Sequence, residues 1–401
     1  MTKALEKTMH TELARTLACQ VKTFVDERII PHELQLAHRD DRSLQLQSDL
    51  AWQARLAGLC NLFYPLSHGG KIASLEDYLI VAEQEGRTEF SQEIFGSHTA
   101  LDAHMLLRFG NEAIHRRFLE PMVAGTAVPS YGMTEPGHSG SVPNLIATTA
   151  GLSNGKWHIN GRKWFISNAD RATFITILAR TGNPDTAVNQ ALSMIMVPTN
   201  TPGFKMERRL TMMGHSYGQG EISLHAVQVP EHYLLGGCGS GTELMNKRLN
   251  LGRLLRAMNW IGLAQRCLDL MGARIHSAHG KFSRLADKQL VRQHMVNAYH
   301  VIASARELIR VAARSVDAQC PDDIAINVAK MAASHALCIA SDSAVQLYGA
   351  EGLSDLTPLF GISRIARSSR ILDGNDESLI SSVGRRLINF YQREPVYSFD
   401  R

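Results

Sequence analysis

Hydrophobic residues follow a helical period at both ends of this 401-residue chain and a strand pattern in its middle. From Leu5 to Val25, apolar residues recur at spacings of three and four, which indicates an amphipathic helix that Pro31 ends. Three more helical patterns precede residue 121 and cover about 43–60, 75–87 and 95–120. The first part of the chain is therefore expected to be helical.

The pattern changes near Pro121, and strand signals run from 128 to about 235. The pairs Asn154-Gly155 and Asn160-Gly161 have the composition of hairpin turns. Closely spaced strands with short turns predict a small antiparallel barrel or sandwich. Further strands are expected at 173–178, 193–197 and 222–229.

A glycine-rich run at 236–241 leads into a second helical region. It does not complete a GxGxxG phosphate loop, because Thr242 takes the place of the third glycine and no βαβ pattern surrounds it. We interpret it as a linker. The long helical patterns that follow predict an antiparallel bundle and cover about 242–275, 288–316, 323–348 and 377–391.

The whole pattern predicts an α+β fold that is mostly α. A chain of this length is expected to form two or three domains. We expect an N-terminal helical domain at 1–121, a middle antiparallel β-barrel domain at 122–236 and a C-terminal four-helix bundle domain at 237–401.

Composition argues against several classes of partner. The 42 basic and 38 acidic residues are spread along the chain, so nucleic acid is not expected as a ligand. No apolar run reaches the length of a membrane span, and the N-terminal residues do not resemble a signal or transit peptide. The six cysteines lack metal-ligand spacing, so we expect neither a metal nor disulfides. A cytoplasmic protein is expected.

Six segments, in order and at matching spacing, resemble motifs of the acyl-CoA dehydrogenase family. The resemblance covers about residues 100–390, and six ordered matches are far more specific than any one of them. The segments are 107–112 with 117–121, 131–137, 160–168, 261–266, 346–349 and 370–374.

The resemblance implies a flavoprotein fold that binds FAD between the barrel and the bundle. It also implies α,β-dehydrogenation of an acyl-CoA thioester, in which a carboxylate removes the α-proton and the β-hydride passes to flavin N5. An electron-transfer flavoprotein is the expected electron acceptor, and a homodimer or homotetramer is the expected assembly. The segments 63–70 and 99–102 are expected to line the acyl pocket.

Asp373 stands where this family usually has a glutamate base. A carboxylate in an apolar pocket is the stronger base, and the N–H of residue 373 is the expected donor to the thioester carbonyl. The alternative interpretation is that Asp373 only caps the last helix. Asp376 and Glu377 suit the first turn of that helix, where the dipole favours acids. Some members of the family have a second base position on the long helix, just before the arginine that matches Arg253. Here that position is Gly252, which offers no carboxylate.

Further site residues follow from the same resemblance. Thr134 is expected to hydrogen-bond the flavin ring, and Gln346 to approach the adenosine half from a neighbouring subunit. Without the flanking motif, Trp164 and Phe165 would be interpreted as barrel core. The expected cofactor-binding residues are Met133, Thr134, Phe165, Ser167, His279, Phe282, Gln289, Gln346, Gly349, Ala350, Asn375 and Glu377, and the expected substrate-binding residues are Gly140, Arg253 and Arg385.

Three departures from the family's motifs lie near the expected phosphates and the loop over the flavin. Gly140 stands in place of a serine. His279 replaces the arginine that meets the FAD diphosphate, and Lys281 or Arg284 could compensate for it. Ala350 replaces the second glycine of a QxxGG motif.

Two alternatives stay open. A flavin oxidase or monooxygenase on the same fold, with a non-CoA substrate, would suit an Asp base. A catalytically degenerate member that acts as an assembly or scaffold partner would suit the lost Arg and Ser contacts.

Overall fold

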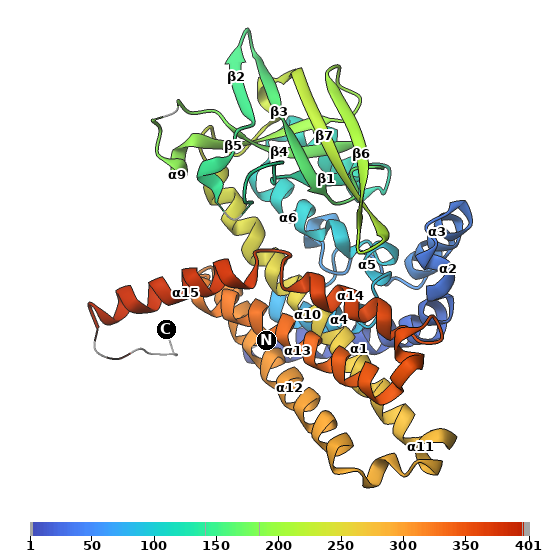
Figure 1. Ribbon diagram of the computed structural model, residues 1–401. Coiled ribbons are helices and arrows are strands. Elements are labelled where there is room, and N and C mark those ends of the chain that lie inside the picture. The colour runs from blue at the N-terminus through green and yellow to red at the C-terminus, as the bar shows by residue number, and fades with distance from the viewer. Residues whose placement is uncertain (1–2, 141, 184, 395, 397–401) are drawn as a thin grey trace. The chain divides into compact units, whose positions relative to one another are not determined.

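The computed structural model describes residues 3–140, 142–183, 185–394 and 396. Ser141 lies outside these described residues. It follows Gly140, which stands in place of the serine of the family motif. The predicted order of helices, strands and helices is confirmed (Figure 1). The chain forms two compact units. Unit 1 comprises Met1–Phe63, Gly70–Ser97 and Asn250–Arg401, and unit 2 comprises Tyr64–Gly69 and His98–Leu249. The ranges of the three predicted domains stay predictions.

Unit 2 holds an eight-stranded sheet in the order β6-β7-β3-β2-β4-β5-β8, with β1 beside β4. Most neighbours are antiparallel, as predicted, but β1 and β2 pair with β4 in parallel, so the sheet is mixed. The strands are β1 (Pro129–Gly132), β2 (Thr149–Ser153), β3 (Lys156–Ile166), β4 (Phe174–Arg180), β5 (Leu192–Pro198), β6 (Phe204–Met212), β7 (His215–Pro230) and β8 (Leu234–Leu235).

Three of the predicted strands are confirmed as β4, β5 and part of β7, whose buried residues form one apolar core. β6 was not predicted. It lies at an edge of the sheet and none of its residues is fully buried. Glu207, Arg208 and Arg209 interrupt the apolar alternation of its sequence. The core consists mainly of Trp157, Ile159, Ile166, Ile175, Ile177, Ile195, Val197, Ile222, Leu224, Val227 and Val229.

Of the two predicted hairpin turns, one is confirmed and one is wrong. Asn154 and Gly155 join β2 to β3 with φ of +51° and +69°, as a two-residue hairpin turn requires. Asn160 and Gly161 instead lie inside β3, where the register against β7 shifts. A Cβ on Gly161 would lie 2.3 Å from the Thr148 hydroxyl, so the glycine permits a close approach within the sheet.

The helical pattern at 95–120 is broken in the structure. α6 (Ala100–Phe109) ends at Gly110, whose backbone is extended. A new helix, α7 (Glu112–Ile114), then begins. The Asn111 side chain caps it by accepting a hydrogen bond from the Ile114 N–H at 2.9 Å. A π turn at 115–119 and α8 (Glu120–Val123) follow.

Unit 1 is helical. Its four long predicted segments are confirmed, and α14 is an additional helix that was not predicted. The helices are α1 (Lys3–Phe24), α2 (Glu33–Ala37), α3 (Asp41–Leu56), α4 (Leu75–Glu85), α5 (Ser91–Ile94), α10 (Gly241–His276, in unit 1 from residue 250 on), α11 (Ala278–Phe282), α12 (Gln289–Asp317), α13 (Asp323–Tyr348), α14 (Leu359–Ser369) and α15 (Asp376–Tyr391).

α13 is the central helix of the bundle and packs against α12, α14 and α15. With the turn after it, it forms Asp323–Leu353, which in the described part of the chain is the one segment long and apolar enough to cross a membrane. Just over half of its most apolar window, 56%, is buried inside the structure, and a core helix passes the same test of length and composition.

α4 and α10 cross with almost no side chain between them. A Cβ added to Gly86 would lie 2.3 Å from the Asn259 carbonyl oxygen, and one added to Gly262 would lie 2.1 Å from that of Glu83. Asn259 also donates from Nδ2 to the Ala82 carbonyl oxygen at 2.8 Å. Gly262, part of one family-like motif, is therefore required for helix packing.

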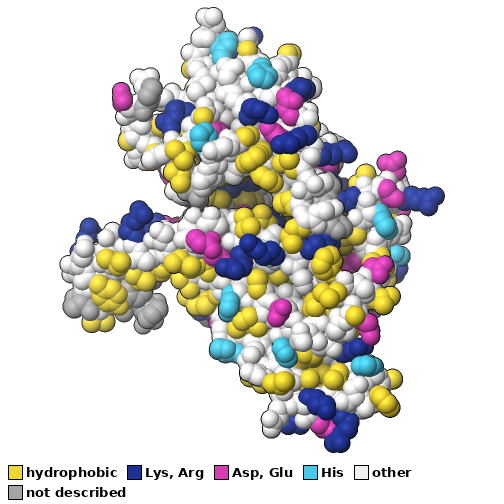
Figure 2. Space-filling view, viewed as in Figure 1, with side chains coloured by type: hydrophobic (Ala, Val, Ile, Leu, Met, Phe, Trp, Pro, Cys, Tyr) yellow, Lys and Arg dark blue, Asp and Glu magenta, His cyan; other side chains and the backbone are white. Residues whose placement is uncertain are grey.

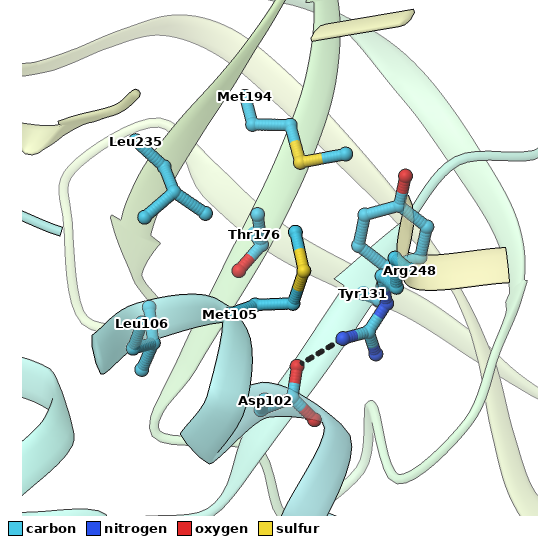
Figure 3. A pocket seen from close by; sticks show the side chains of 8 residues that line it. All are labelled: Asp102, Met105, Leu106, Tyr131, Thr176, Met194, Leu235 and Arg248. Carbon is cyan, nitrogen blue, oxygen red and sulfur yellow. Dashed lines mark hydrogen bonds and ion pairs between the residues drawn. The ribbon is translucent and has the colours of Figure 1, made fainter. Parts of the chain in front are cut away.

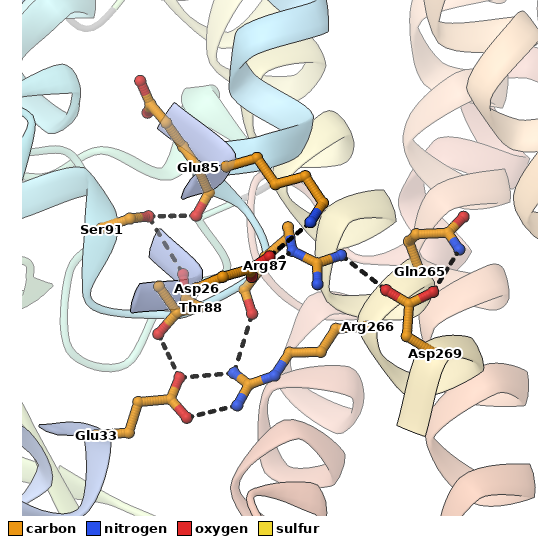
Figure 4. A network of polar contacts seen from close by, with 10 residues as sticks. Asp26, Glu33, Glu85, Arg87, Thr88, Ser91, Gln265, Arg266 and Asp269 are labelled. Carbon is orange, nitrogen blue, oxygen red and sulfur yellow. Dashed lines mark hydrogen bonds and ion pairs between the residues drawn. The ribbon is translucent and has the colours of Figure 1, made fainter. Parts of the chain in front are cut away.

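A polar network beside this crossing ties α2, α4 and α10 together (Figure 4). Arg266 pairs with both carboxylate oxygens of Glu33 at 2.7 Å and donates to the Arg87 carbonyl oxygen at 3.0 Å. Arg87 in turn pairs with Asp26 at 3.1 Å and Asp269 at 2.8 Å. Bidentate pairs of this kind fix orientation as well as distance.

Glu85, at the end of α4, is buried and has no cation partner among the described residues. It is 1% exposed, and its carboxylate accepts hydrogen bonds from the Tyr78 hydroxyl at 3.1 Å and the Ser97 hydroxyl at 2.5 Å. Burial raises its pKa to about 7, although the two hydroxyl groups oppose the shift.

This buried acid predicts a pH-dependent stability. The folded protein binds the Glu85 proton more tightly than the unfolded chain, whose pKa lies near 4.5. The resulting stabilisation is complete below pH 4.5 and is lost as the pH rises through about 7, by up to about 3 kcal/mol. We expect Glu85→Gln to reduce the fall of the unfolding free energy over this range, measured by chemical denaturation, while Glu89, whose pKa burial also raises to about 7, keeps its own contribution. The exposed-acid control Glu112→Gln should keep the wild-type slope, and a Glu85→Gln protein with that same slope would contradict the assignment.

Candidate active site

Asp373 lies in the short turn between α14 and α15. Its backbone is left-handed, with φ of +57°, and so is that of Gly374, with φ of +99°. The N-cap of α15 is Asn375, whose side chain accepts from the Ser378 N–H at 2.8 Å. The alternative interpretation of Asp373 as the helix cap is therefore wrong, whereas the first-turn position of Glu377 and its neighbour is confirmed.

Two cations hold the backbone of this turn. Arg253 donates from Nε to the Asp373 carbonyl oxygen at 2.9 Å and from Nη1 to Asn327 Oδ1 at 3.0 Å. Lys330, whose side chain is fully buried, donates to the Gly374 carbonyl oxygen at 2.9 Å. Burial lowers the pKa of both cations, and neighbouring carboxylates oppose that effect. Arg253, expected to contact the acyl-CoA, thus supports the backbone of Asp373.

The Asp373 carboxylate faces a third cation. Arg256 Nε lies 3.4 Å from Asp373 Oδ2, with the two side chains 45% and 27% exposed. An apolar wall was expected here, and the structure instead has a guanidinium group one turn along α10 from Arg253. An ion pair this exposed adds little stability. In the described part of the chain the N–H of Asp373 has no acceptor, so it remains available to a ligand.

A buried ion pair below the turn was missed by the sequence analysis. Lys330 Nζ lies 3.0 Å from Asp376 Oδ1. Asp376 also accepts from Arg370 Nε at 3.1 Å and from the Ser334 hydroxyl at 3.3 Å. The first residue of α15 is thereby anchored to α13.

In unit 2, Thr134 and Trp164 join the segment after β1 to β3. The Thr134 hydroxyl donates to the Trp164 carbonyl oxygen at 2.6 Å, and the Trp164 N–H donates to the Thr134 carbonyl oxygen at 3.0 Å. Phe165 follows in a β-bulge, with φ of +50°. The residue is 45% exposed, so its interpretation as barrel core is wrong. Ser167 is also exposed, and its carbonyl oxygen accepts from the Ser130 hydroxyl.

A second buried ion pair supports this segment. Lys163 Nζ, with no exposed surface, lies 2.7 Å from Glu135 Oε1 and donates to the Met133 carbonyl oxygen at 3.0 Å. Glu135 also accepts from the N–H groups of Ala147 at 2.7 Å and Thr148 at 3.0 Å. Burial lowers the pKa of Lys163 to about 8 against the effect of Glu135. Burial acts to raise the pKa of Glu135, but Lys163 and the hydrogen bonds outweigh the effect of burial, so the pKa of Glu135 is lowered.

Gly140 packs against Thr134. A Cβ on Gly140 would lie 2.5 Å from the Thr134 Cγ2 methyl group, whose position is fixed by the hydroxyl bond to Trp164. The absence of a serine at this position therefore has a local cause: the methyl group occupies the space that a side chain would need.

A small pocket in unit 2 contains Asp102, which was expected to line the acyl pocket (Figure 3). Asp102 pairs there with Arg248 at 2.7 Å, and the guanidinium group lies 4.4 Å from the centre of the Tyr131 ring. The Tyr131 hydroxyl is buried and has no hydrogen-bond partner among the described residues, and burial raises its pKa strongly. The charge of Asp102 is thus already paired within the protein. The other lining residues are Met105, Leu106, Thr176, Met194 and Leu235.

The remaining predicted cofactor residues lie at the opposite end of the unit 1 bundle (Figure 1). There α10 ends, and its Arg274 pairs with Glu351 at 3.0 Å. The start of α12 meets the end of α13 through a contact of 3.0 Å between His294 and Ser343. From Arg253 to Arg274 the helix rises about 31 Å. The residues at this end are His279, Phe282, Gln289, Gln346, Gly349 and Ala350.

The structure thus brings together only part of the predicted site. Near Asp373 it places Arg253 and Asn375, and Glu377 is exposed with its carboxylate 3.9 Å from Arg370. Arg385 is exposed farther along α15. No group of three or more His, Cys, Asp or Glu side chains in the described ranges is placed to hold a metal ion.

The Gly140 contact generates a prediction. Gly140→Ser is expected to push Thr134 aside and to lower the unfolding free energy by about 1–3 kcal/mol, because the added atoms overpack the loop. Thr134→Ser removes the Cγ2 methyl group but keeps the hydroxyl donor, so Gly140→Ser should cost much less in that background. A double-mutant cycle by denaturation measures the difference. Equal costs in both backgrounds would show that the methyl group is not the obstacle.

Family models describe this chain over most of its length. The acyl-CoA dehydrogenase N-terminal domain matches residues 11–126, the middle domain matches residues 130–227 and the C-terminal domain matches residues 239–388. These matches include all of the turn around Asp373 and the Thr134 segment.

Named relatives agree. A probable acyl-CoA dehydrogenase, FadE2, of Mycobacterium tuberculosis is 34% identical over 84% of each chain. Acyl-CoA dehydrogenase family member 11 of Mus musculus is 30% identical over 91% of this chain, which spans about half, 49%, of that relative's length. The structure of a putative acyl-CoA dehydrogenase from Mycobacterium abscessus superposes with a TM-score of 0.85 at 30% identity, over 94% of this chain and 98% of that one. The chain therefore belongs to the acyl-CoA dehydrogenase family.

Proposed function

We propose that the protein oxidises the Cα–Cβ bond of an acyl-CoA thioester with a bound FAD, and that Asp373 removes the α-proton. The Asp373 turn carries this proposal, because one residue there offers both a partly exposed carboxylate and an N–H without an acceptor among the described residues. The reaction needs both groups: a proton must be accepted while the thioester oxygen gains negative charge. Family membership supports the same chemistry.

Each part of the turn has a role in this proposal. The Asp373 N–H donates to the thioester carbonyl, which stabilises the enolate-like oxygen. The Asp373 carboxylate receives the proton from the α-carbon. Arg256 Nε, 3.4 Å from Asp373 Oδ2, orients this carboxylate. Arg253 keeps the backbone of the turn in place through the Asp373 carbonyl oxygen.

The residues of the chain suit a flavin. When bound, FAD accepts the hydride from the β-carbon of the substrate. Thr134, Trp164 and Phe165 would hold its ring system, and Phe165 gives the best evidence of fit. An aromatic side chain that is 45% exposed on a left-handed backbone is unusual, and a stacked ring would account for it. Phe282, 90% exposed, offers a second aromatic surface for the other half of the cofactor.

The two groups of cofactor residues in unit 1 favour a site shared between two copies of the chain. The groups lie about 31 Å apart along α10, which is longer than an extended FAD molecule. Large apolar side chains are exposed on the bundle and on α15, where a second copy could cover them (Figure 2). We therefore propose that Asp373 of one copy and the Phe282 end of another serve the same FAD in a homodimer or homotetramer.

An anaerobic visible spectrum, titrated with a panel of acyl-CoA esters, tests the proposal as a whole. Bleaching of the flavin by one of the esters is the expected result, with an electron-transfer flavoprotein as the proposed reoxidant. Bleaching only by a non-CoA substrate, with rapid reoxidation in air, would favour a flavin oxidase or monooxygenase. A purified protein that cannot be loaded with FAD would favour the scaffold alternative.

The base assignment gives a direct prediction. Asp373→Asn should retain the flavin spectrum and lose about 10²- to 10⁴-fold in the rate of bleaching, because the amide cannot accept the α-proton. Asp355→Asn is the matched control, since this aspartate is exposed and is not among the expected site residues. Stopped-flow absorbance measures both rates. If the flavin of the Asp373→Asn protein bleaches at the wild-type rate, Asp373 is not the base.

The shared site predicts complementation between two inactive variants. Phe282→Asp should fail to hold FAD without disturbing the fold, since the side chain is 90% exposed. Heteromers of Phe282→Asp and Asp373→Asn chains, purified through two different tags, should recover activity because one of their sites has both native ends. Heteromers that stay as inactive as the two separate variants would contradict a site built from two copies.

A further inference from the structure

The Asp373 turn has an unusual backbone that needs support. Two successive residues with positive φ, at +57° and +99°, are uncommon, and only the second is a glycine. α15 begins immediately afterwards, and the Asp376 N–H reaches back to the Arg370 carbonyl oxygen at 3.0 Å. The turn is thus confined between two helices, and its own peptide groups decide where the carboxylate points.

Lys330 contributes a contact to this backbone that is separate from its ion pair. Its ammonium group donates to the Gly374 carbonyl oxygen at 2.9 Å and to Asp376 Oδ1 at 3.0 Å, and its side chain has no exposed surface. The peptide unit between Gly374 and Asn375 is planar and trans, so fixing its oxygen also fixes the opposite direction of its N–H. Rotation of this peptide would change the backbone angles of the turn that carries Asp373.

Asp376 does not depend on Lys330 alone. Arg370 Nε and the Ser334 hydroxyl also bind its carboxylate, at 3.1 Å and 3.3 Å. The second acceptor of the Lys330 ammonium group lies on the turn itself, at the Gly374 carbonyl oxygen. A fully buried ammonium group is costly to leave unpaired, and in some proteins such a group specifies one local structure.

We propose that Lys330 is a positioning residue for the proposed base, holding the Gly374 peptide so that the Asp373 carboxylate reaches the α-carbon of the substrate. This inference rests on the proposed function of Asp373. It assigns to a residue on α13, outside the turn, control over the proton-transfer step. Lys330 touches neither substrate nor cofactor in this account and acts through the backbone alone.

The test separates the backbone contact from the ion pair. Asp376→Asn removes the carboxylate but leaves the bond from Lys330 to the Gly374 carbonyl oxygen. Adding Lys330→Met to that variant removes this bond without leaving a buried carboxylate unpaired. Exchange of the substrate α-proton in D₂O, followed by mass spectrometry, reports the transfer from carbon to the Asp373 carboxylate. Flavin absorbance, thermal unfolding and the Kd of the acyl-CoA report whether cofactor binding, stability and substrate binding have changed.

The double variant is expected to exchange the α-proton about 10²-fold more slowly than Asp376→Asn, with flavin content and Kd unchanged, since a displacement of about 1 Å has that effect. Equal exchange rates in the two variants would overturn the role of Lys330. A slower rate accompanied by equal losses of flavin and affinity would also overturn it, because it would indicate a general structural role. If the Met variant does not fold, Lys330→Gln in the same background decides by the same criteria.

The wild-type protein distinguishes failure of this inference from failure of the proposed function. If it neither exchanges nor oxidises any of the thioesters, the proposed function fails and the role of Lys330 fails with it. If it does both and the paired variants behave alike, only the role of Lys330 is lost.

Discussion

The close crossing of α4 and α10 at Gly86 and Gly262 is the contact on which unit 1 depends. Where backbones approach this closely, any side chain would force the helices apart. The long helix α10 is then fixed in both position and rotation. Its rotation decides that Arg253 and Arg256 face the Asp373 turn and that Arg266 faces Glu33. A glycine contact far from the turn thereby sets the charges around the proposed base.

The Asp373 turn and the segment after β1 are each stabilised by a fully buried lysine. In unit 1, the fully buried Lys330 binds a turn carbonyl and Asp376. In unit 2, the fully buried Lys163 binds the Met133 carbonyl oxygen and Glu135. A buried lysine must find several acceptors, and irregular backbone supplies free carbonyl groups that regular strands and helices do not. Each loop is thus held by a charge that would be expensive to leave unpaired.

Much of the fold could be predicted because long periodic segments and turn residues report directly on local structure. The bundle helices and the Asn154-Gly155 turn are of this kind. Asn160-Gly161 misled because the same pair also suits a bulge, and only the approach of Thr148 from another part of the chain decides between the two. The signal of β6 is weak because Glu207, Arg208 and Arg209 interrupt its apolar alternation, which an edge strand tolerates.

The site was predictable only where a motif resembled the family. Asp373, Thr134 and Phe165 were named that way, whereas Lys330 and Arg256 were not, because their partners lie more than forty residues away in sequence. One signal for Lys330 was present: it is a charged residue on the buried stripe of an apolar helix. Periodicity can flag such a residue, but which carbonyl it binds depends on tertiary structure.

The left-handed backbone of Asp373 also restricts which acid the position accepts. Aspartate is among the few residues, after glycine, that adopt positive φ readily, because its short side chain can bond to nearby backbone groups. A glutamate would have to adopt the same strained conformation without that local bonding, or the turn would have to change shape. The identity of the acid and the shape of its turn therefore depend on each other. An exchange of one carboxylic acid for the other requires a change in the backbone as well as in the length of the side chain.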